Sequence, residues 1–447
     1  MKKFLCCFLL LIIPLISASN AQTVADPALL AEINRIKAID SHAHPLPFLD
    51  EGEKDVEWEV AEFIPPENLP VRLRADNPEY LEAWRVLYGY RYNDFSETHI
   101  RELIKMKRRV MREKGADYPA WVLDRLGIET MFVNRITMGR GLNSPRFRWV
   151  WHANPLLFPL SNEEAKKSNP QRQAKFTTDE KWLKDFLVEV KIAKLPDTLD
   201  DYVNKLVIPL LERRKKDGAV AVKFYAAYMR SLDFANAPET EARRVYAKYA
   251  NAVNAPSAAE YKVLQDYLLR RLAFECGRVG LAVHIHVGAG AGGWFYNSDA
   301  SPFLLESVLN DPKLRNTKFV LIHGGLPFAQ ATKFLIRKPN VYADFSGQTF
   351  LTSTRELSQV IRSWLEFYPE KILFGTDALP LTVTVGWEEI GWLTTKSARQ
   401  ALAIALTEMM NDGEITRKRA SELARMVMRD NAVNLYGLKS NSMSLAR

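Results

Sequence analysis

The chain has 447 residues, 47% of them apolar, so it can bury a large core without the help of disulfide bonds. Its formal net charge of +8 comes partly from basic clusters at 105–109 and 213–216, which lie in helix-like segments with acidic neighbours. We interpret these clusters as solvated helix faces, which argues against nucleic acid as a partner and leaves only a mild preference for anionic ligands.

The first 21 residues are typical of a secretory signal peptide. Two lysines precede an apolar run that ends near Ile16, and small residues precede Gln22, which predicts cleavage after Ala21. The run is shorter than the roughly 20 residues that a membrane crossing needs, so we expect no stable membrane insertion. We predict an exported protein, periplasmic or secreted, whose residues 22–447 form a single domain.

Cleavage at this point would leave Cys276 as the only cysteine of the mature chain, because Cys6 and Cys7 belong to the signal peptide. No intramolecular disulfide can then form, even in an oxidising compartment. The net charge would fall from +8 to +6 with the loss of Lys2 and Lys3. Cys276 lies in a helix-like apolar segment, so we interpret it as a buried helix residue rather than a nucleophile.

Short apolar runs alternate with amphipathic segments along most of the chain. Continuous apolar runs that are separated by helices predict parallel strands buried on both faces. Eight runs qualify as strands, at 38–44, 128–135, 147–155, 219–225, 281–288, 318–325, 340–346 and 371–377. Eight β/α units in one domain predict an α/β fold, the (β/α)8 TIM barrel. An open doubly wound sheet is the alternative, but no glycine-rich phosphate loop follows the first strand.

Two long segments interrupt the alternation, after the first and the third strands. Residues 46–125 contain charged, helix-like stretches, and residues 156–197 are polar and irregular. We predict long helical insertions that cover the carboxyl ends of the strands, where barrels build their active sites. Residues 287–293 are rich in glycine and follow the fifth strand, which indicates a flexible active-site loop. The last helix is predicted to end near Gly437.

Polar residues stand at the ends of nearly all the predicted strands, although buried parallel strands should be apolar. The first strand carries His42 and His44, whose side chains share a face because successive strand residues alternate. A lone histidine is more often a core residue than a ligand, but a divalent metal needs several donors that converge from different strands. The complete set of strand-end residues is His42, His44, Lys223, His284, His286, His323 and Asp377.

Four motifs in order resemble the amidohydrolase superfamily, specifically its amidohydrolase-related branch of metal-dependent hydrolases and decarboxylases. They are "DSHAHP" (40–45), "HVG" (286–288), "LIHGG" (321–325) and "ILFGTDA" (372–378). The resemblance covers most of the mature chain. It implies a barrel with a divalent metal at the strand ends, for which Zn²⁺ is the first candidate, as one or two ions.

The resemblance also implies a role for each matching residue. His42, His44 and His286 would be metal ligands, and His323 would be a ligand or polarise the substrate. Asp377 would contact the metal and take the proton of an attacking water.

Four further residues are assigned around this core. Lys223 is either a carboxylated lysine that bridges two metals or, equally, a lysine that binds an anionic substrate. His284 should lie one layer deeper in the barrel than the ligands and is a candidate substrate-binding residue. Tyr228 and Arg230 follow the fourth strand and are candidate substrate contacts, although a plain loop role is comparable.

Two of the chain's seven histidines fall outside the set. His99 lies in a charged segment, so we predict that it is at the surface. His152 ends the third strand, and its sequence context leaves open whether it faces the site.

Two enzymatic hypotheses follow. The first is a hydrolase that uses a metal-activated water to cleave an amide, lactone or ester bond of a small substrate, which could be anionic. The second is a metal-dependent non-oxidative decarboxylase of an aromatic or unsaturated acid. A binding protein that merely keeps the fold is disfavoured, because the ligands and the acid–base aspartate are all present. Self-association into a homo-oligomer is left open.

Overall fold

The computed structural model describes residues 23–50, 52–55, 57, 68–168 and 172–438. The predicted signal peptide, 1–21, lies outside these residues, and so does its cleavage site. No helix in the described part of the chain is long and apolar enough to span a membrane. Export and the exact start of the mature chain therefore stay predictions.

Eight parallel strands form one sheet in which the spatial order follows the chain order. This arrangement confirms the predicted (β/α)8 barrel, and each strand begins within three residues of its predicted start. The strands are β1 (Ala38–Ala43), β2 (Ile128–Arg135), β3 (Phe147–His152), β4 (Ala219–Phe224), β5 (Ala282–His286), β6 (Phe319–Ile322), β7 (Val341–Asp344) and β8 (Ile372–Leu373).

Backbone hydrogen bonds between the first and the last strand regions close the barrel. The Ser41 amide donates to the Phe374 carbonyl at 2.9 Å, the Asp377 amide to the His42 carbonyl at 2.7 Å, and the His44 amide to the Ala378 carbonyl at 2.7 Å. Strand β8 itself is shorter than the predicted 371–377. Beyond the strand, Asp377 adopts a positive φ of 55°, which is outside the extended region.

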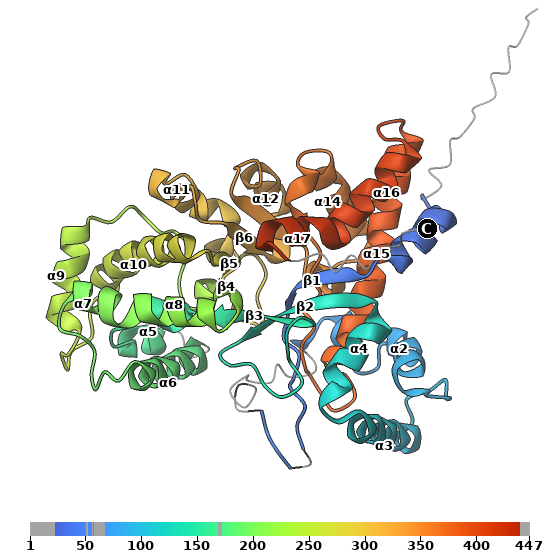
Figure 1. Cartoon of the computed structure of the whole chain (residues 1–447), viewed down its shortest axis with the longest axis horizontal. Helices are drawn as coiled ribbons and strands as arrows, with labels where there is room; N and C mark the ends of the chain where they lie inside the picture. Colours follow the sequence, from blue (N-terminus) through green and yellow to red (C-terminus); the bar gives the residue numbers. More distant parts are fainter. Residues whose placement is uncertain (1–22, 51, 56, 58–67, 169–171, 439–447) are drawn as a thin grey trace, which may run out of the picture.

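Helices flank the barrel on either side (Figure 1). Those of at least six residues are α1 (Pro27–Arg35), α2 (Glu79–Tyr88), α3 (Glu97–Lys114), α4 (Tyr118–Leu126), α5 (Glu163–Ser168), α6 (Gln173–Glu189), α8 (Ile208–Lys216), α9 (Glu239–Tyr249), α10 (Ala258–Val279), α12 (Ala329–Leu335), α14 (Thr354–Leu365), α15 (Trp387–Asn411), α16 (Arg417–Arg425) and α17 (Asn431–Tyr436). Gly437 ends α17 in a left-handed conformation, as predicted.

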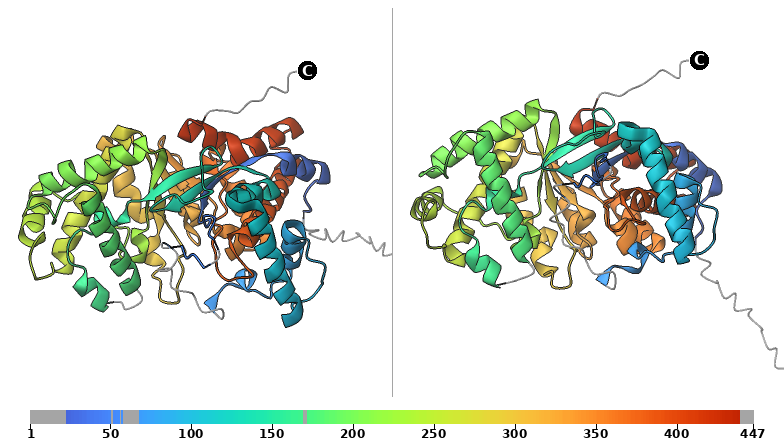
Figure 2. Two further views of the ribbon diagram at one scale, coloured as in Figure 1. Left: turned by 60° about the horizontal axis from the view of Figure 1, so that its bottom comes forward. Right: turned by 90° about the horizontal axis from the view of Figure 1, so that it is seen from below.

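The two insertions lie on opposite sides of the carboxyl ends of the strands, the end we call the mouth. Seen from below, α2 and α3 stand on one side and α5 and α6 on the other (Figure 2). The second insertion is more regular than its polar sequence indicated, because α6 is a helix of 17 residues. Its buried positions include Phe176, Leu183 and Phe186, a helical spacing that the surrounding charges obscured.

The first insertion is held to the barrel by a buried ion pair. Lys107 of α3 donates to Glu389 of α15 at 2.7 Å, and both side chains are buried. Trp84 of α2 donates to the Thr384 carbonyl at 3.1 Å, in the segment that leads from β8 to α15. The interpretation of 105–109 as a wholly solvated face was therefore wrong for Lys107, because a long-range carboxylate neutralises it inside the protein.

The second basic cluster needs the same correction at one position. Arg214 of α8 is buried and pairs with Glu189 at the end of α6. Its guanidinium also lies 4.8 Å from the ring centroid of Trp151 in β3. The neighbouring Arg213 is exposed, as expected of a solvated face.

The amino-terminal end of the barrel, which we call the floor, is closed by α17. Tyr436 packs against Phe132 of β2 with ring centroids 4.5 Å apart. Its hydroxyl lies 2.7 Å from Nε2 of His284. The buried apolar residues of this layer are Ile39, Phe132, Val150, Ala221, Ala282, Val320, Ile322, Leu373, Ala432 and Leu435. The carboxyl-terminal helix is thus part of the barrel core.

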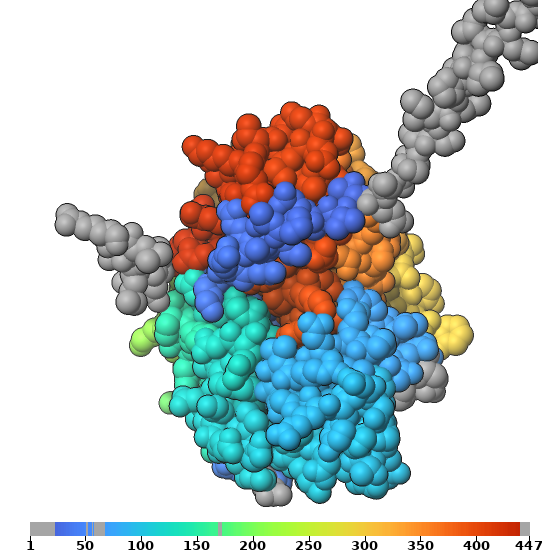
Figure 3. All heavy atoms as spheres, turned by 90° about the vertical axis from the view of Figure 1, so that its right-hand side faces the viewer, coloured from blue at the N-terminus to red at the C-terminus, as the bar shows by residue number. Residues whose placement is uncertain are grey.

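Helix α1 lies against the carboxyl-terminal helices (Figure 3), where the Asp26 amide donates to Oγ1 of Thr407 at 2.9 Å and Arg417 donates to the Asp26 carboxylate at 3.0 Å. Arg399 of α15 donates to the carbonyls of Ile36 at 2.8 Å and Gly127 at 3.2 Å, which ties the segment before β1 to the segment before β2. Cys276 is fully buried in α10, as predicted. Burial raises the pKa of its thiol far above the usual range, which keeps it unreactive.

Candidate active site

Three predicted ligands converge at the mouth of the barrel. Nε2 of His42 lies 3.3 Å from Oδ1 of Asp377, and Nε2 of His44 lies 3.5 Å from the same oxygen. One donor atom from each of the three side chains falls within 4.8 Å of the others. This spacing suits a single metal ion bound by two imidazoles and a carboxylate.

The first strand is irregular where it supplies these histidines. Between Asp40 and Ala43 the register with β2 shifts, which is the mark of a bulge. The buried Asp40 side chain stabilises this irregular segment by accepting from the His42 amide at 3.1 Å and from the Thr376 amide at 3.0 Å. The alternation of side chains along a strand predicted that His42 and His44 point in the same direction. The hydrogen bonds of Asp40 hold the backbone in the conformation that gives this direction.

His286 and His323 extend the cluster from the fifth and sixth strands. The ring centroids of His286 and His323 are 4.7 Å apart, and those of His323 and His42 are 5.0 Å apart. Nδ1 of His323 lies 3.8 Å from Oδ2 of Asp377 and 3.0 Å from Oγ of Ser346. Four histidines and one aspartate predicted from the sequence are therefore one spatial group.

Backbone strain is concentrated in this group. Among the described residues, the non-glycine positions with positive φ are Lys191, His323 and Asp377, so two of the three belong to the site. Such conformations cost free energy and persist at functional positions. Gly347 makes room for them, because a Cβ there would lie 3.0 Å from Nδ1 of His323.

A second carboxylate, Asp344 at the end of β7, supports the histidines from behind. It accepts from the His323 amide at 2.7 Å, from Oγ of Ser346 at 2.8 Å and from Oγ of Ser41 at 3.3 Å. Burial raises the pKa of Asp344 to about 6. Asp344 and Asp40 were not predicted as site residues, although both are acids in apolar strands, the signal that identified the histidines.

The protonation states suit metal ligation. Burial holds the pKa of His42 and of His286 well below the usual range and lowers that of His323 to about 4. Burial opposes ionisation of Asp377, but His323, His42 and His44 hold its pKa well below the usual range. The site therefore presents neutral imidazoles and an anionic carboxylate at neutral pH, the forms in which these groups bind metals.

Unpaired buried nitrogen atoms also fit a metal. Among the described residues, Nδ1 and Nε2 of His42 and Nε2 of His286 have no hydrogen-bond partner. Buried polar groups are nearly always satisfied, so several unsatisfied ones together indicate a missing ligand. The residues present fit the divalent ion that the sequence predicted.

Lys223 lies beneath this group in the register of β4, paired with His152 on one side and His284 on the other. Its ammonium nitrogen is buried and has no hydrogen-bond partner in the described part of the chain. Burial lowers the pKa of Lys223 to about 7, and the carboxylates of Asp377 and Asp344 oppose this effect. Either predicted role of Lys223 is compatible with its position.

Two residues predicted to contact the substrate, Arg230 and His284, bond to other parts of the fold instead. The guanidinium of Arg230 donates to Asp266 at 2.8 Å and to Gln265 at 3.0 Å, both on α10, so it serves to fix its own loop. His284 lies one layer deeper, as predicted, where its bond to Tyr436 gives it a place in the floor. Neither residue joins the group around Asp377. His99 of α3 pairs with Asp94 at 2.7 Å and stacks on Tyr92, so it does not join this group either.

Tyr228 and three residues that the sequence analysis did not assign border the group. The Tyr228 ring lies 4.6 Å from His286 and 5.0 Å from Phe295 of the glycine-rich loop, measured between centroids. His152 lies 6.5 Å from His44 and 5.5 Å from Tyr225. Neither ring nitrogen of His152 has a hydrogen-bond partner among the described residues. Aromatic rings therefore line the group on the sides of β3, β4 and β5.

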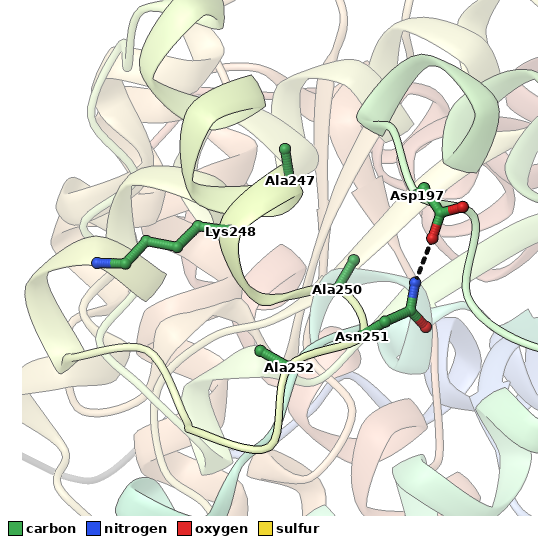
Figure 4. A pocket seen from close by; sticks show the side chains of 6 residues that line it. All are labelled: Asp197, Ala247, Lys248, Ala250, Asn251 and Ala252. Atoms are coloured by element: carbon green, nitrogen blue, oxygen red, sulfur yellow. Dashed lines mark hydrogen bonds between the residues drawn. The ribbon is translucent and has the colours of Figure 1, made fainter.

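A separate open pocket of about 320 Å³ lies between the end of α9 and the segment before Thr198 (Figure 4). It is lined by Asp197, Lys248, Asn251 and three alanines. The Asp197 carboxylate already accepts from the Asn251 amide at 2.7 Å. This pocket holds no histidine and does not provide a catalytic group.

Comparison with known proteins agrees with the fold and the motifs. A family model described as amidohydrolase matches residues 151–438. The protein fluG of Emericella nidulans is 24% identical over 244 residues, which are 51% of this chain and 26% of that protein. This chain thus aligns with about a quarter of its curated relative.

Three solved structures match almost the whole chain. A protein from Lactobacillus casei ATCC 334 described as a metal-dependent hydrolase is 16% identical, with a TM-score of 0.58 over 93% of this chain and 98% of that one. The uronate isomerase of Thermotoga maritima is 15% identical, with a TM-score of 0.58 and coverages of 92% and 98%. The glucuronate isomerase of Caulobacter crescentus is 13% identical, with a TM-score of 0.59 and coverages of 94% and 97%. At these identities the likeness concerns the fold.

Proposed function

The chain belongs to the amidohydrolase family, and from this premise we propose that it is a metal-dependent hydrolase of a small amide, lactone or ester. The observation that carries the proposal is the convergence of His42, His44 and Asp377, with donor atoms within 4.8 Å of one another. The neutral histidines His286 and His323 complete the group from two more strands. A fold alone would not support this choice, because one barrel supports many reactions.

Each side chain has a role that follows from its position. His42, His44 and Asp377 would hold the ion, with His286 as a further ligand. A bound Zn²⁺ or similar ion would lower the pKa of a water ligand from about 15.7 toward 7. Because Oγ of Ser346 donates to Asp344, Nδ1 of neutral His323 would donate to Ser346, which leaves Nε2 as an acceptor that is available to the ion.

Asp377 is the proton carrier of this proposal. It accepts a proton from the attacking water on a carboxylate oxygen and donates it to the leaving nitrogen or oxygen. The water oxygen forms a bond to the carbonyl carbon, and the C–N or C–O bond breaks. The low pKa of Asp377 keeps the carboxylate ionised at neutral pH.

The test combines metal analysis with a substrate panel. Protein purified without chelator should contain at least one equivalent of divalent metal, and its removal should abolish turnover until Zn²⁺ is added back. The panel contains amides, lactones, aryl esters, aryl acids and a hexuronate, and both acid release and CO2 are measured.

Each outcome decides between reactions. Metal-dependent acid release from an amide, lactone or ester supports the hydrolase. CO2 from an aryl acid would replace it with the decarboxylase, and interconversion of the hexuronate would replace it with an isomerase of the kind that shares this fold. Activity that survives complete metal removal would contradict all three.

We also propose that the protein acts after export. The support is the signal-like segment 1–21, which precedes the first described helix. Expression in a bacterial host followed by cell fractionation and intact-mass measurement tests it. The expected product is a periplasmic or secreted chain that begins near Gln22, whereas an intact amino terminus in the cytoplasm would contradict export.

A further inference from the structure

His152, at the end of β3, continues a row of imidazole rings that runs across the mouth. Successive ring centroids are 4.7, 5.0, 5.1 and 6.5 Å apart in the order His286, His323, His42, His44 and His152. The first four rings belong to the group around Asp377. His152 is therefore the next imidazole beyond that group.

The row is most open to solvent at the ligand beside His152. The His44 side chain is 28% exposed, whereas that of His42 is 1% exposed and that of Asp377 is 18% exposed. His286 and His323, at the other end of the row, are buried. A substrate that approaches the ion therefore passes His44 and comes close to His152.

The His152 ring has no hydrogen-bond partner of its own. Its Nδ1 and Nε2 atoms are both buried, and neither forms a hydrogen bond within the described part of the chain. Burial holds the pKa of His152 well below its usual range, and the Asn134 backbone opposes this shift without forming a hydrogen bond to the ring. Buried polar groups are nearly always satisfied, so a side chain with two unpaired nitrogens indicates a ligand.

Aromatic rings pack beside His152 but do not bond to its nitrogens. The His152 centroid lies 5.8 Å from that of Trp182 and 5.5 Å from that of Tyr225. The Tyr225 hydroxyl is already used, since it donates to the carboxylate of Asp179. His152 as a whole is partly exposed. With no hydrogen bond to fix it, the ring can turn about its Cβ–Cγ bond and present a nitrogen to a molecule at the mouth.

The chemistry of a neutral imidazole defines what this molecule must offer. One ring nitrogen carries the proton, and the other accepts a hydrogen bond whichever tautomer is present. A carboxylate or a ketone has no hydrogen to give to that acceptor. An amide or a hydroxyl group both donates and accepts, so it can pair with either nitrogen.

We propose that His152 is a substrate-binding residue, and that the substrate carries an amide or hydroxyl group beyond the bond that is cleaved, which donates to the imidazole. The substrate class is then a small amide, lactone or ester with this second polar group. The inference rests on the proposed hydrolase function, because it takes the ion at His42, His44 and Asp377 as the place where the reacting carbonyl is held.

The experiment measures binding, so it does not depend on turnover. Succinamate and levulinate share a carboxylate for the ion and the same spacer, and they end in an amide and a methyl ketone respectively. Glutaramate and the keto acid one carbon longer than levulinate form a second pair with a longer spacer. All four are titrated by calorimetry into the full chain with Zn²⁺ added.

Three variants are compared with wild type after their metal content and melting temperature have been measured. His152→Phe keeps a flat ring but removes both nitrogens, and His152→Gln keeps a donor and an acceptor. His99→Phe makes the same change at a histidine that stacks on Tyr92 and pairs with Asp94. It is the matched control.

In at least one pair, wild type should bind the amide about fivefold or more tightly than the ketone, which is the effect of about one hydrogen bond. His152→Phe should weaken the amide to within about twofold of the ketone and leave the ketone unchanged. His152→Gln should keep part of the preference, and His99→Phe should behave as wild type. No amide preference in either pair, a preference that survives in His152→Phe, or an equal loss in His99→Phe would each overturn the inference.

The same measurements separate this inference from the proposed function. Hydrolysis in the substrate panel without an amide preference would leave the hydrolase standing and remove the role of His152. An amide preference that His152→Phe abolishes, without acid release from any substrate, would keep the binding site and remove the hydrolase.

Discussion

The mouth and the floor of the barrel use buried histidines in opposite ways. On β5, His286 and His284 are two residues apart and both are buried. At the floor, Nε2 of His284 meets the Tyr436 hydroxyl at 2.7 Å within an apolar layer. At the mouth, Nε2 of His286 meets no hydrogen-bond donor or acceptor in the described part of the chain. One histidine thus belongs to the packing and the other is available to a ligand.

This difference shows which buried polar groups serve function. An unsatisfied buried group costs about 1–3 kcal/mol, so a fold under selection for stability alone would pair it or replace it. The mouth keeps several such atoms together with two strained backbone positions, His323 and Asp377. At the floor, His284 leaves one buried nitrogen, Nδ1, without a partner, but its Nε2 is bonded to Tyr436. Substitutions at the mouth should therefore change metal content and turnover, and substitutions at the floor should change stability.

The largest effect is expected from removing two ligands at once. His42→Ala with His44→Ala should lower metal affinity by more than the roughly 10- to 100-fold that loss of a supporting group causes, and turnover should become undetectable. The metal-free variant should be no less stable than the metal-free wild type, since unpaired nitrogens are lost. Metal analysis and melting temperature with and without chelator measure this. His99→Ala is the control, and full metal in the double variant would exclude this site.

Asp377→Asn should reduce turnover by about 10²- to 10⁴-fold, the contribution that general acid–base catalysis usually makes. Asparagine suits this test because it tolerates the positive φ of 55° as well as aspartate does, so the backbone is not newly strained. It keeps an oxygen ligand but cannot accept a proton at neutral pH. Turnover per metal-loaded molecule is the measurement, and a variant that is merely less stable would remove Asp377 from the mechanism.

Asp344→Asn, also at the mouth, should have a smaller effect on metal affinity and turnover. The carboxylate accepts from the His323 amide and from Ser346 and Ser41, and an amide group would place a donor against one of these donors. We expect a loss of about 10- to 100-fold in metal affinity or turnover, as is usual for groups that orient ligands. Asp185→Asn, at an exposed position on α6, is the matched control. Equal behaviour of the two variants would mean that Asp344 supports only the fold.

The barrel and the core of the site could be predicted because their signal is local. Apolar strands make an embedded His42, His286 or Asp377 conspicuous, and the known geometry of parallel barrels brings strand ends together. What failed depends on partners distant in sequence. Arg230 was a candidate substrate contact, but its guanidinium donates to Asp266, 36 positions later in the chain. Lys107 was predicted to be solvated, but it is buried and donates to Glu389, 282 positions later in the chain.

The surroundings of α6 could not be predicted from the sequence for a related reason. The pattern of α6 indicates a helix face, but nothing in the sequence of 156–197 says which element that face meets. Asp179 bonds to Asn154 and Tyr225, and Trp182 meets His152, all of them on other elements. The positive φ of His323 and Asp377 is equally a product of the folded loops.

Tyr436→Phe tests the floor and should leave the mouth unaffected. The ring still packs on Phe132 at a centroid distance of 4.5 Å, but Nε2 of His284 loses its partner inside the apolar layer. The free energy of unfolding should fall by about 1–3 kcal/mol, the cost of one unsatisfied buried group. Metal content and turnover per folded molecule should stay within about twofold of wild type, because α17 closes the end of the barrel opposite the ligands.

The prediction for Tyr436→Phe is tested by denaturant unfolding, metal analysis and turnover, all measured on one preparation. Tyr342→Phe makes the same chemical change on β7 at a partly exposed ring that packs against the same floor, so it should cost less. If Tyr436→Phe instead lowers metal content or turnover while stability is unchanged, His284 acts together with the ligands above it. The separation of a catalytic mouth from a structural floor would then be wrong, because the two histidines of β5 would belong to one network.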